Sequence, residues 1–206
     1  MWDDAPAPRN DGQSNKVSRV TPEERRARFG QKPVTVLMTG LTGSGKTAIA
    51  AAVERKLFDA GRAVARLDGE LIRRGLSSDL GYSVEDRSEN LRRGAYLAHA
   101  LNEAGVLCIA SFVAPNEAVR QRVAATIGED RFLVVHVATP IEVCRQRDTK
   151  GQYVKADAGE LPNFPGVTAP YEPPAEPALR ISAEQDDIDS CADQVIELLR
   201  SRGFIR

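Results

Sequence analysis

The sequence predicts a three-layer α/β domain, in which helices flank a parallel β-sheet. Apolar, β-branched runs alternate with helical patterns over most of the chain. A glycine-rich loop joins the first such run to the first long helical pattern. The length of 206 residues suits one domain with a substantial core.

Strands are expected where apolar and β-branched residues form a run of about four to eight, which suits a strand buried on both faces. In a parallel sheet, ligands bind beyond the carboxyl ends of the strands. The residues that follow each run are therefore candidates for chemistry. Five runs qualify, at residues 34–39, 63–67, 106–113, 132–137 and 178–181.

Helices are expected where a capping residue precedes small or apolar residues at helical spacing. Thr21, with Pro22 and two acids after it, predicts the first helix, and Ser83 with two acids predicts the longest. Thr139 and the proline after it predict the start of a short one. The expected helices cover residues 22–29, 48–58, 83–105, 115–127, 139–147 and 188–199.

The glycine-rich loop fits the pattern of Gly, four residues, and Gly-Lys-Ser/Thr, whose backbone N–H groups surround phosphates at a helix start. The lysine adds a full positive charge, and the last hydroxyl can join a Mg²⁺ shell. This context predicts a P-loop NTPase-type domain that binds a nucleoside triphosphate. The phosphate loop consists of Gly40, Leu41, Thr42, Gly43, Ser44, Gly45, Lys46 and Thr47.

Composition divides the chain into three parts. Residues 1–20 are polar and predict a disordered tail or linker, and residues 21–206 predict one P-loop kinase domain. Residues 148–178 hold most of the prolines and lack periodicity, so we expect a lid at about 148–175.

Charge and cysteine usage exclude several classes of protein. The net charge of -1 and pI of about 6.2 give no basic surface for nucleic acid. No apolar run reaches the ~20 residues of a membrane span. Three scattered cysteines fit a reducing, cytoplasmic setting, and we expect Cys108 and Cys144 to be buried thiols.

Charged residues follow the second expected strand. Asp68 ends it, where a carboxylate can accept a proton from an attacking hydroxyl, help to hold a metal, or simply favour a turn before Gly69. Several arginines, an Asn and Tyr82 come next. Guanidinium groups suit a second anionic ligand and Tyr82 can stack on a base, although each arginine alone also fits a solvated helix face.

This ordered set resembles the adenylylsulfate kinases, which transfer the γ-phosphoryl group of ATP to the 3′-hydroxyl of adenosine 5′-phosphosulfate. The resemblance spans roughly residues 34–179. Besides the phosphate loop, it rests on Leu-Asp-Gly-Glu (67–70), Arg-Arg-Gly-Leu (73–76), Asp-Leu-Gly-Tyr-Ser (79–83), Asp-Arg-Ser-Glu-Asn-Leu-Arg-Arg (86–93), Cys-Ile-Ala-Ser-Phe-Val-Ala-Pro (108–115), Thr-Pro-Ile-Glu-Val-Cys (139–144), Arg-Asp-Thr-Lys-Gly-Gln-Tyr (147–153) and Gly-Val-Thr-Ala-Pro-Tyr-Glu (166–172).

The resemblance implies a role for each matching residue. Asp68 is the general base, Lys46 the catalytic cation, and Thr47 the ligand of Mg²⁺. Cys144 and Arg147 lie near the ATP adenine. The residues implied to bind the second substrate are Arg73, Tyr82, Arg87, Asn90, Phe112 and, from the lid, Lys150.

The resemblance also implies partners. Family members act in sulfate assimilation and are commonly homodimers. Residues 17–25 resemble the segment that joins this kinase to the GTPase subunit of sulfate adenylyltransferase in bacterial fusions. We therefore expect a homodimer and a kinase domain fused to, or associated with, sulfate adenylyltransferase.

Five positions depart from the family pattern. Glu70 and Leu71 stand where the family has Asp and Asn, and Tyr82 replaces a Phe. Ala114 replaces a Ser that is phosphorylated in some members. Asp157 reverses the charge of a lid arginine, which weakens closure over two anions unless its side chain faces away.

Two other interpretations stay open. A P-loop kinase acting on another nucleoside-like or small hydroxyl acceptor would use the same Asp68. A GTPase-like switch would carry Asn-Lys-x-Asp after the fourth strand, whereas Asn15-Lys16 precedes the phosphate loop and has no Asp at that spacing. The switch is accordingly the least favoured of the three.

Overall fold

The computed structural model describes residues 20–184 and 187–206. The tail predicted over residues 1–20 lies outside this part of the chain, except for Val20. The described strands form one five-stranded parallel sheet in the order β2-β3-β1-β4-β5. Their bounds are β1 Thr35–Thr39, β2 Val64–Asp68, β3 Leu107–Ser111, β4 Phe132–Val137 and β5 Leu179–Ile181.

All five strands occur where the sequence predicts them, but the third is shorter than expected. Phe112 and Val113 were predicted to continue it, and both lie beyond its end. The carbonyl of Val113 accepts a hydrogen bond from the Thr39 hydroxyl at 2.5 Å, and the chain then turns through Ala114 at a φ of 43°. The strand therefore ends because the backbone bends toward the end of β1.

The structure contains every predicted helix and adds short ones. The helices α3 and α7 and the 3₁₀ turn η2 were not predicted, because five, six and three residues show no helical repeat. The helices are α1 Pro22–Phe29, α2 Lys46–Asp59, α3 Gly69–Arg73, α4 Val84–Glu103, α5 Glu117–Ile127, η2 Glu129–Arg131, α6 Ile141–Gln146, α7 Gln152–Asp157 and α8 Ile188–Ser201.

Two of the three predicted helix caps are confirmed. The Thr21 hydroxyl accepts from the N–H of Glu24 at 3.2 Å, and Ser83 caps α4. The prediction that Thr139 helps to cap α6 is wrong, since α6 starts without a side-chain cap. The Thr139 hydroxyl instead donates to the carbonyl of Ser44 at 2.8 Å, and so supports the phosphate loop.

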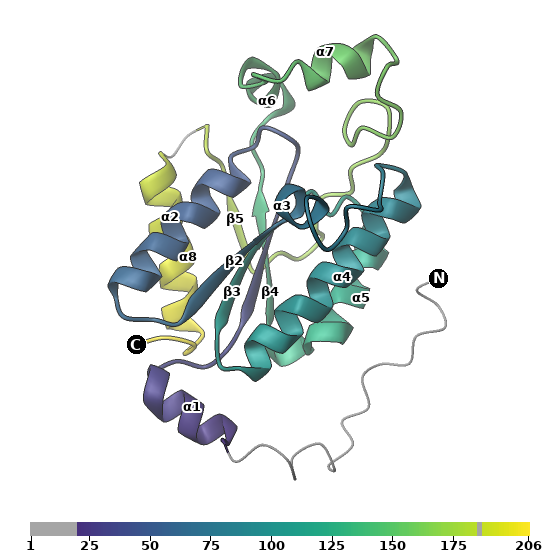
Figure 1. Cartoon of the computed structure of the whole chain (residues 1–206). Helices are drawn as coiled ribbons and strands as arrows, with labels where there is room; N and C mark the ends of the chain where they lie inside the picture. The colour runs from purple at the N-terminus through teal and green to yellow at the C-terminus, as the bar shows by residue number, and fades with distance from the viewer. Residues whose placement is uncertain (1–19, 185–186) are drawn as a thin grey trace.

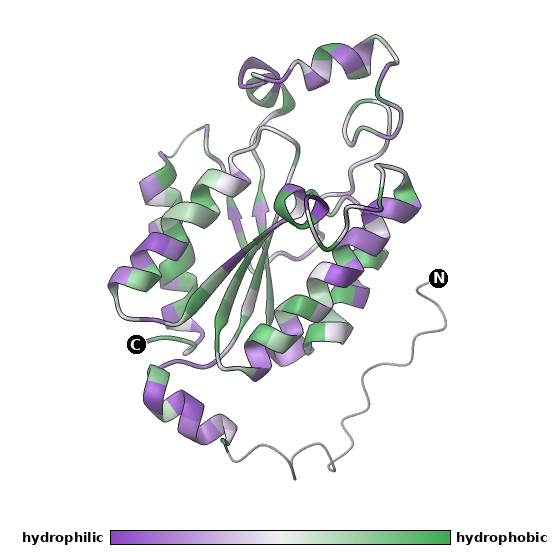
Figure 2. Ribbon diagram, in the orientation of Figure 1, coloured by the Kyte–Doolittle hydropathy of each residue, from purple (hydrophilic) through white to green (hydrophobic). Residues whose placement is uncertain are grey.

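The sheet lies between two helical layers (Figure 1). The helices α2 and α8 cover one face, and α4 and α5 cover the other, while α6 and α7 lie beyond the carboxyl ends of the strands. Alternation along β1 directs Val36 and Met38 into the first core and Leu37 into the second. Figure 2 shows hydrophobic residues along much of the central strands, as a sheet covered on both faces requires.

A third, smaller apolar cluster lies apart from these two cores. It consists of Cys144, Tyr153, Ala156 and Phe164, with Leu41 and three other partly buried side chains packed against it. Since it joins α6, α7 and the phosphate loop, it holds the α7 region against the site edge of the sheet. All three cysteines are buried, as expected for Cys108 and Cys144.

Within the described residues, no helix has the length and apolarity needed to cross a membrane.

Two adjacent residues of α2 provide a test of the core. Leu57 is 1% exposed and packs against the sheet, whereas Phe58 is 63% exposed. We expect Leu57→Ala to lower the free energy of unfolding by about 2–5 kcal/mol, because it removes buried methyl groups and leaves a cavity. Phe58→Ala is the control, with an expected loss below about 1 kcal/mol. Equal losses in urea denaturation would contradict this placement of α2.

Candidate functional site

The side chain of Lys46 lies inside the phosphate loop. Its Nζ donates to the carbonyl oxygens of Gly40 at 2.9 Å and Leu41 at 2.6 Å, and contacts Ser44 Oγ at 3.3 Å. Burial lowers the pKa of Lys46 to about 8, although the negative charges of Asp68 and Glu70 oppose this shift. A buried ammonium group with neutral oxygen partners is well suited to an anionic phosphate.

Glycine is required where the loop approaches its neighbours. Gly43 has a φ of 80°, and a Cβ there would lie 2.8 Å from the carbonyl oxygen of Cys144 in α6. This contact places Cys144 directly against the phosphate loop. Arg147 lies near it too, because its guanidinium donates at 2.8 Å to the carbonyl of Ala183, a residue that packs over Gly45.

Tyr153, which sequence reasoning missed, links α7 to the same loop. Its hydroxyl donates to the carbonyl of Thr42 at 2.8 Å, and its ring packs edge-on against Phe164 with the ring centres 5.0 Å apart. The side chain is buried, and this burial raises the pKa of Tyr153. The hydroxyl therefore stays protonated and remains a donor to the loop.

Asp68 joins the phosphate loop to the strands beside it. Its Oδ2 accepts from Thr47 Oγ1 and from Ser111 Oγ, both at 2.9 Å. Its Oδ1 accepts from the N–H groups of Glu70 at 2.9 Å and Leu71 at 3.3 Å, and so caps α3. Asp68 therefore stabilises the turn into α3, as one of its expected roles, and it also contacts the phosphate loop.

These hydrogen bonds decide the charge of Asp68. Half-burial raises its pKa, but the four donors more than offset this effect, and the net pKa is below the usual value. Asp68 is therefore a carboxylate at neutral pH. Sequence reasoning missed Ser111 as a partner of Asp68, because the expected strand continued past it to residue 113, whereas β3 ends at Ser111 in register with Asp68.

Three predicted binding residues meet at one end of α4. The guanidinium carbons of Arg73 and Arg87 lie 4.6 and 5.3 Å from the centre of the Tyr82 ring. Arg87 also donates through Nε to the carbonyl of Tyr82 at 3.1 Å. Burial lowers the pKa of both arginines, and for Arg87 the charge of Arg73 adds to the effect. Two neighbouring cations over an exposed aromatic ring suit an anionic ligand that carries a base.

Asn90 and Phe112 are more buried than Arg73, Tyr82 and Arg87. Asn90 donates to the carbonyl of Gly69 at 3.4 Å, and its buried Oδ1 has no hydrogen-bond partner among the described residues. This oxygen is therefore free to accept a hydrogen bond from a bound ligand. Phe112 is buried between Gly69 and Gly94, where a Cβ on either glycine would meet its ring at 2.9 Å.

Two residues that depart from the family pattern, Glu70 and Asp157, have charged partners. Lys150, from the expected lid, forms an ion pair with Glu70 at 2.9 Å. Asp157 forms a two-bonded ion pair with Arg145 of α6, at 2.5 and 3.0 Å. The reversed charge of Asp157 is thus neutralised within the α6–α7 region.

The remaining departures leave the polar contacts of the site intact. Leu71 is 57% exposed, so no buried amide is lost there. Ala114 is buried, and its carbonyl accepts from the buried guanidinium of Arg120 at 2.6 Å. This position holds a backbone turn and carries no hydroxyl for phosphorylation.

The family model described as adenylylsulphate kinase matches residues 32–182. The chain belongs to the adenylylsulphate kinase family. Family members most similar to it include a bifunctional enzyme CysN/CysC of Rhodopirellula baltica, 66% identical over all 206 residues, which make up 32% of that protein.

Some other members of the family extend only a little beyond the matched region. An adenylyl-sulfate kinase of Halothermothrix orenii is 45% identical over 175 residues, which cover 85% of this chain and 94% of the relative. Among solved structures, the APS kinase CysC of Mycobacterium tuberculosis, in complex with AMPPNP and APS, matches with a TM-score of 0.78 and 40% identity. That match covers 82% of this chain and 99% of the other.

The buried charge of Lys46 predicts a pH dependence of stability in the absence of nucleotide. Its pKa is about 8 in the folded chain and 10.5 when exposed, so between these values the unfolded chain binds more protons. The free energy of unfolding of the wild type, relative to Lys46→Met, is expected to rise as the pH rises from 8 to 10. Urea denaturation at several pH values measures it, and parallel curves for the two proteins would contradict the burial of this charge.

Proposed function

We propose that the protein transfers the γ-phosphoryl group of ATP to the 3′-hydroxyl of adenosine 5′-phosphosulfate and yields 3′-phosphoadenylylsulfate for sulfate assimilation. The observation that carries this proposal is the position of Asp68. Its carboxylate contacts Thr47 of the phosphate loop, and the carbonyl of Gly69, the next residue, accepts from Asn90, which lies one helical turn from Arg87 on α4. The donor and acceptor halves therefore meet at one carboxylate.

The phosphate loop supplies the donor half. Lys46 exchanges its carbonyl partners for the β- and γ-phosphate oxygens, and its charge stabilises the negative charge that spreads over the transferred group. Asp68, held by hydrogen bonds, orients the attacking hydroxyl and accepts its proton late in the reaction, so a low pKa does not prevent this role.

Mg²⁺ is the cofactor we propose, and the donor atoms suit it. The Thr47 hydroxyl and the Asp68 carboxylate lie 2.9 Å apart, and hydroxyl and carboxylate oxygens are the ligands that Mg²⁺ accepts beside phosphate oxygens. Thr47 would hold the ion directly, and the Asp68 carboxylate would orient the Thr47 hydroxyl through the hydrogen bond that it accepts from it. When bound, Mg²⁺ neutralises charge on the β- and γ-phosphates.

Arg73, Tyr82 and Arg87 supply the acceptor half. Arg73 and Arg87 provide two partly buried cations for the phosphosulfate group, and the Tyr82 ring provides a surface for adenine. The unpaired Oδ1 of Asn90 offers an acceptor to a ligand hydroxyl. The Mycobacterium tuberculosis relative was solved with APS, which supports this assignment.

A kinase for another small hydroxyl acceptor is the alternative. Solved gluconokinase and shikimate kinase structures share the fold at 13% and 16% identity, and such distant matches concern the fold alone. A coupled assay of ADP release, with adenosine 5′-phosphosulfate, shikimate, gluconate or adenosine as acceptor, decides between them. Turnover with a sugar acid or nucleoside but not with adenosine 5′-phosphosulfate would overturn the proposal.

We also propose association with sulfate adenylyltransferase and self-association as a homodimer, in the cytoplasm. The R. baltica relative, a bifunctional enzyme, supports the association with a second enzyme.

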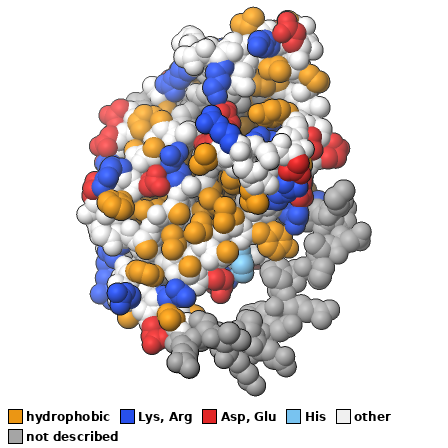
Figure 3. All heavy atoms as spheres, in the orientation of Figure 1, with side chains coloured by type: hydrophobic (Ala, Val, Ile, Leu, Met, Phe, Trp, Pro, Cys, Tyr) orange, Lys and Arg blue, Asp and Glu red, His pale blue; other side chains and the backbone are white. Residues whose placement is uncertain are grey.

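An exposed apolar surface supports the homodimer. Figure 3 shows hydrophobic side chains gathered on the face where Figure 1 places β2 and α4, and Leu97 of α4 is 37% exposed. Analytical ultracentrifugation tests the dimer, and a monomer at micromolar concentration would exclude it.

Asp68→Asn separates a catalytic role from a binding role. The amide cannot accept the proton of the acceptor hydroxyl, so kcat is expected to fall by about 10²-fold or more while ATP affinity changes little. Ser111→Ala is the control, since it removes one donor to Asp68 but keeps the carboxylate. Stopped-flow ATP binding and steady-state rates measure the two effects. An equal loss of ATP affinity in Asp68→Asn would instead indicate a metal-holding or structural role.

A further inference from the structure

The segment that carries Tyr82 has no regular secondary structure of its own. Residues 74–83, here called the acceptor loop, connect α3 to α4. Tyr82 is 57% exposed, and the guanidinium groups of Arg73 and Arg87 cover only part of its ring. The position of the ring depends on contacts that fix the backbone of the acceptor loop.

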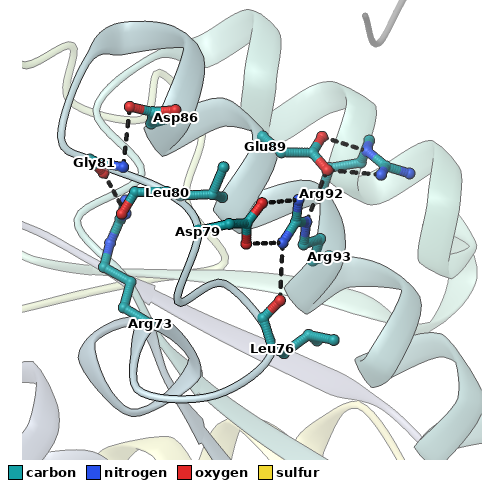
Figure 4. A network of polar contacts seen from close by, with 9 residues as sticks. All are labelled: Arg73, Leu76, Asp79, Leu80, Gly81, Asp86, Glu89, Arg92 and Arg93. Atoms are coloured by element: carbon teal, nitrogen blue, oxygen red, sulfur yellow. Dashed lines mark hydrogen bonds and ion pairs between the residues drawn. The ribbon is translucent and has the colours of Figure 1, made fainter.

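Arg93 of α4 makes such contacts to the loop (Figure 4). Its Nη1 donates to the carbonyl of Leu76 at 2.8 Å. Its two Nη groups form a fork on the Asp79 carboxylate, at 2.5 and 2.8 Å. Its Nε donates to Glu89 at 2.9 Å, which fixes the guanidinium plane against the helix. One side chain thus binds the loop at two points and the helix at a third.

The anchored residues lead directly to the binding residues. Asp79 is followed by Leu80 and Gly81, whose carbonyls accept from the guanidinium of Arg73. The N–H of Gly81 donates to Asp86 at 3.1 Å, so α4 holds the loop here as well. Tyr82 comes next along the chain. A shift at Asp79 therefore moves both the Tyr82 ring and the partner of Arg73.

We infer that Arg93 is a positioning residue for the acceptor substrate. It acts through Leu76 and Asp79 on the acceptor loop, and it does not touch the phosphate loop contacts described above. Without these hydrogen bonds, the acceptor loop has more conformational freedom, which binding of the acceptor substrate must remove. Binding of the acceptor substrate is therefore weakened far more than binding of ATP. This inference deepens the proposed function and rests on it.

Arg92 is a matched control next to Arg93. It lies on the same helix and binds the same Glu89, at 2.6 and 2.8 Å. Its guanidinium carbon lies 5.5 Å from the centre of the Tyr96 ring, on α4 itself. Arg92→Gln removes the same charge and the same type of ion pair, but leaves the Leu76 and Asp79 contacts intact.

The test is steady-state kinetics with each substrate varied in turn. For Arg93→Gln we expect the KM for adenosine 5′-phosphosulfate to rise about 10-fold or more, with the KM for ATP within about twofold of wild type. Arg92→Gln is expected to leave both values within about twofold. Arg93→Lys keeps the charge but lacks the planar fork, so its effect is expected to be intermediate.

A second measurement keeps the inference testable if the variants are less stable or if the proposed function fails. Hydrogen exchange of the ligand-free proteins is expected to be faster over residues 74–83 in Arg93→Gln and unchanged there in Arg92→Gln. Equal effects of the two substitutions on KM, or on exchange of the loop, would overturn the role of Arg93. Absence of turnover by the wild type with adenosine 5′-phosphosulfate would overturn the proposed function instead. Hydrogen exchange of residues 74–83 would still test the role of Arg93.

Discussion

The Asp68 carboxylate accepts hydrogen bonds from two side chains that are distant in sequence, Thr47 of the phosphate loop and Ser111 at the end of β3. It also accepts from N–H groups of α3, the helix that directly follows it. The strand order makes this possible. The strand β3 lies between β2, which ends in Asp68, and β1, which leads into the phosphate loop. Its last residue, Ser111, therefore lies beside the Asp68 carboxylate on the side of the loop. Each donor also fixes the direction of an element that carries binding residues. The geometry of both halves of the site therefore depends on this one ionised group.

Much of this arrangement is encoded locally. The phosphate loop, the five strands and the family were predicted from residues close together in sequence, and the structure and comparisons confirm them. The short helices α3 and α7 were not, because fewer than two helical turns leave no periodic signal. Thr139 was misassigned since its hydroxyl bonds to Ser44, 95 residues away, and no local pattern reveals such a partner. The roles of the predicted site residues remain predictions, although the structure brings them to one edge of the sheet.

The unusual charges near the site are balanced by neighbours. Glu70 pairs with Lys150 and Asp157 pairs with Arg145, and all four side chains are substantially exposed. Such pairs contribute only about 0–1 kcal/mol to stability. Their effect is on orientation: Lys150 is held toward α3, and the Asp157 carboxylate at the end of α7 is held against Arg145 of α6. The acidic substitution in the expected lid therefore adds little negative potential over the phosphates, which agrees with divergence within one activity.

The third apolar cluster is separate from the two cores that cover the sheet, and it is small. Moving α7 away from the phosphate loop exposes these few side chains and releases the Tyr153 hydroxyl from Thr42, while the strands stay covered. The free energy of this local opening is accordingly smaller than that of global unfolding. We therefore expect the α7 region to open more readily than the sheet unfolds. Because this region contacts the phosphate loop at Leu41 and Thr42, we expect binding of a nucleotide to that loop to be linked to closure of α7.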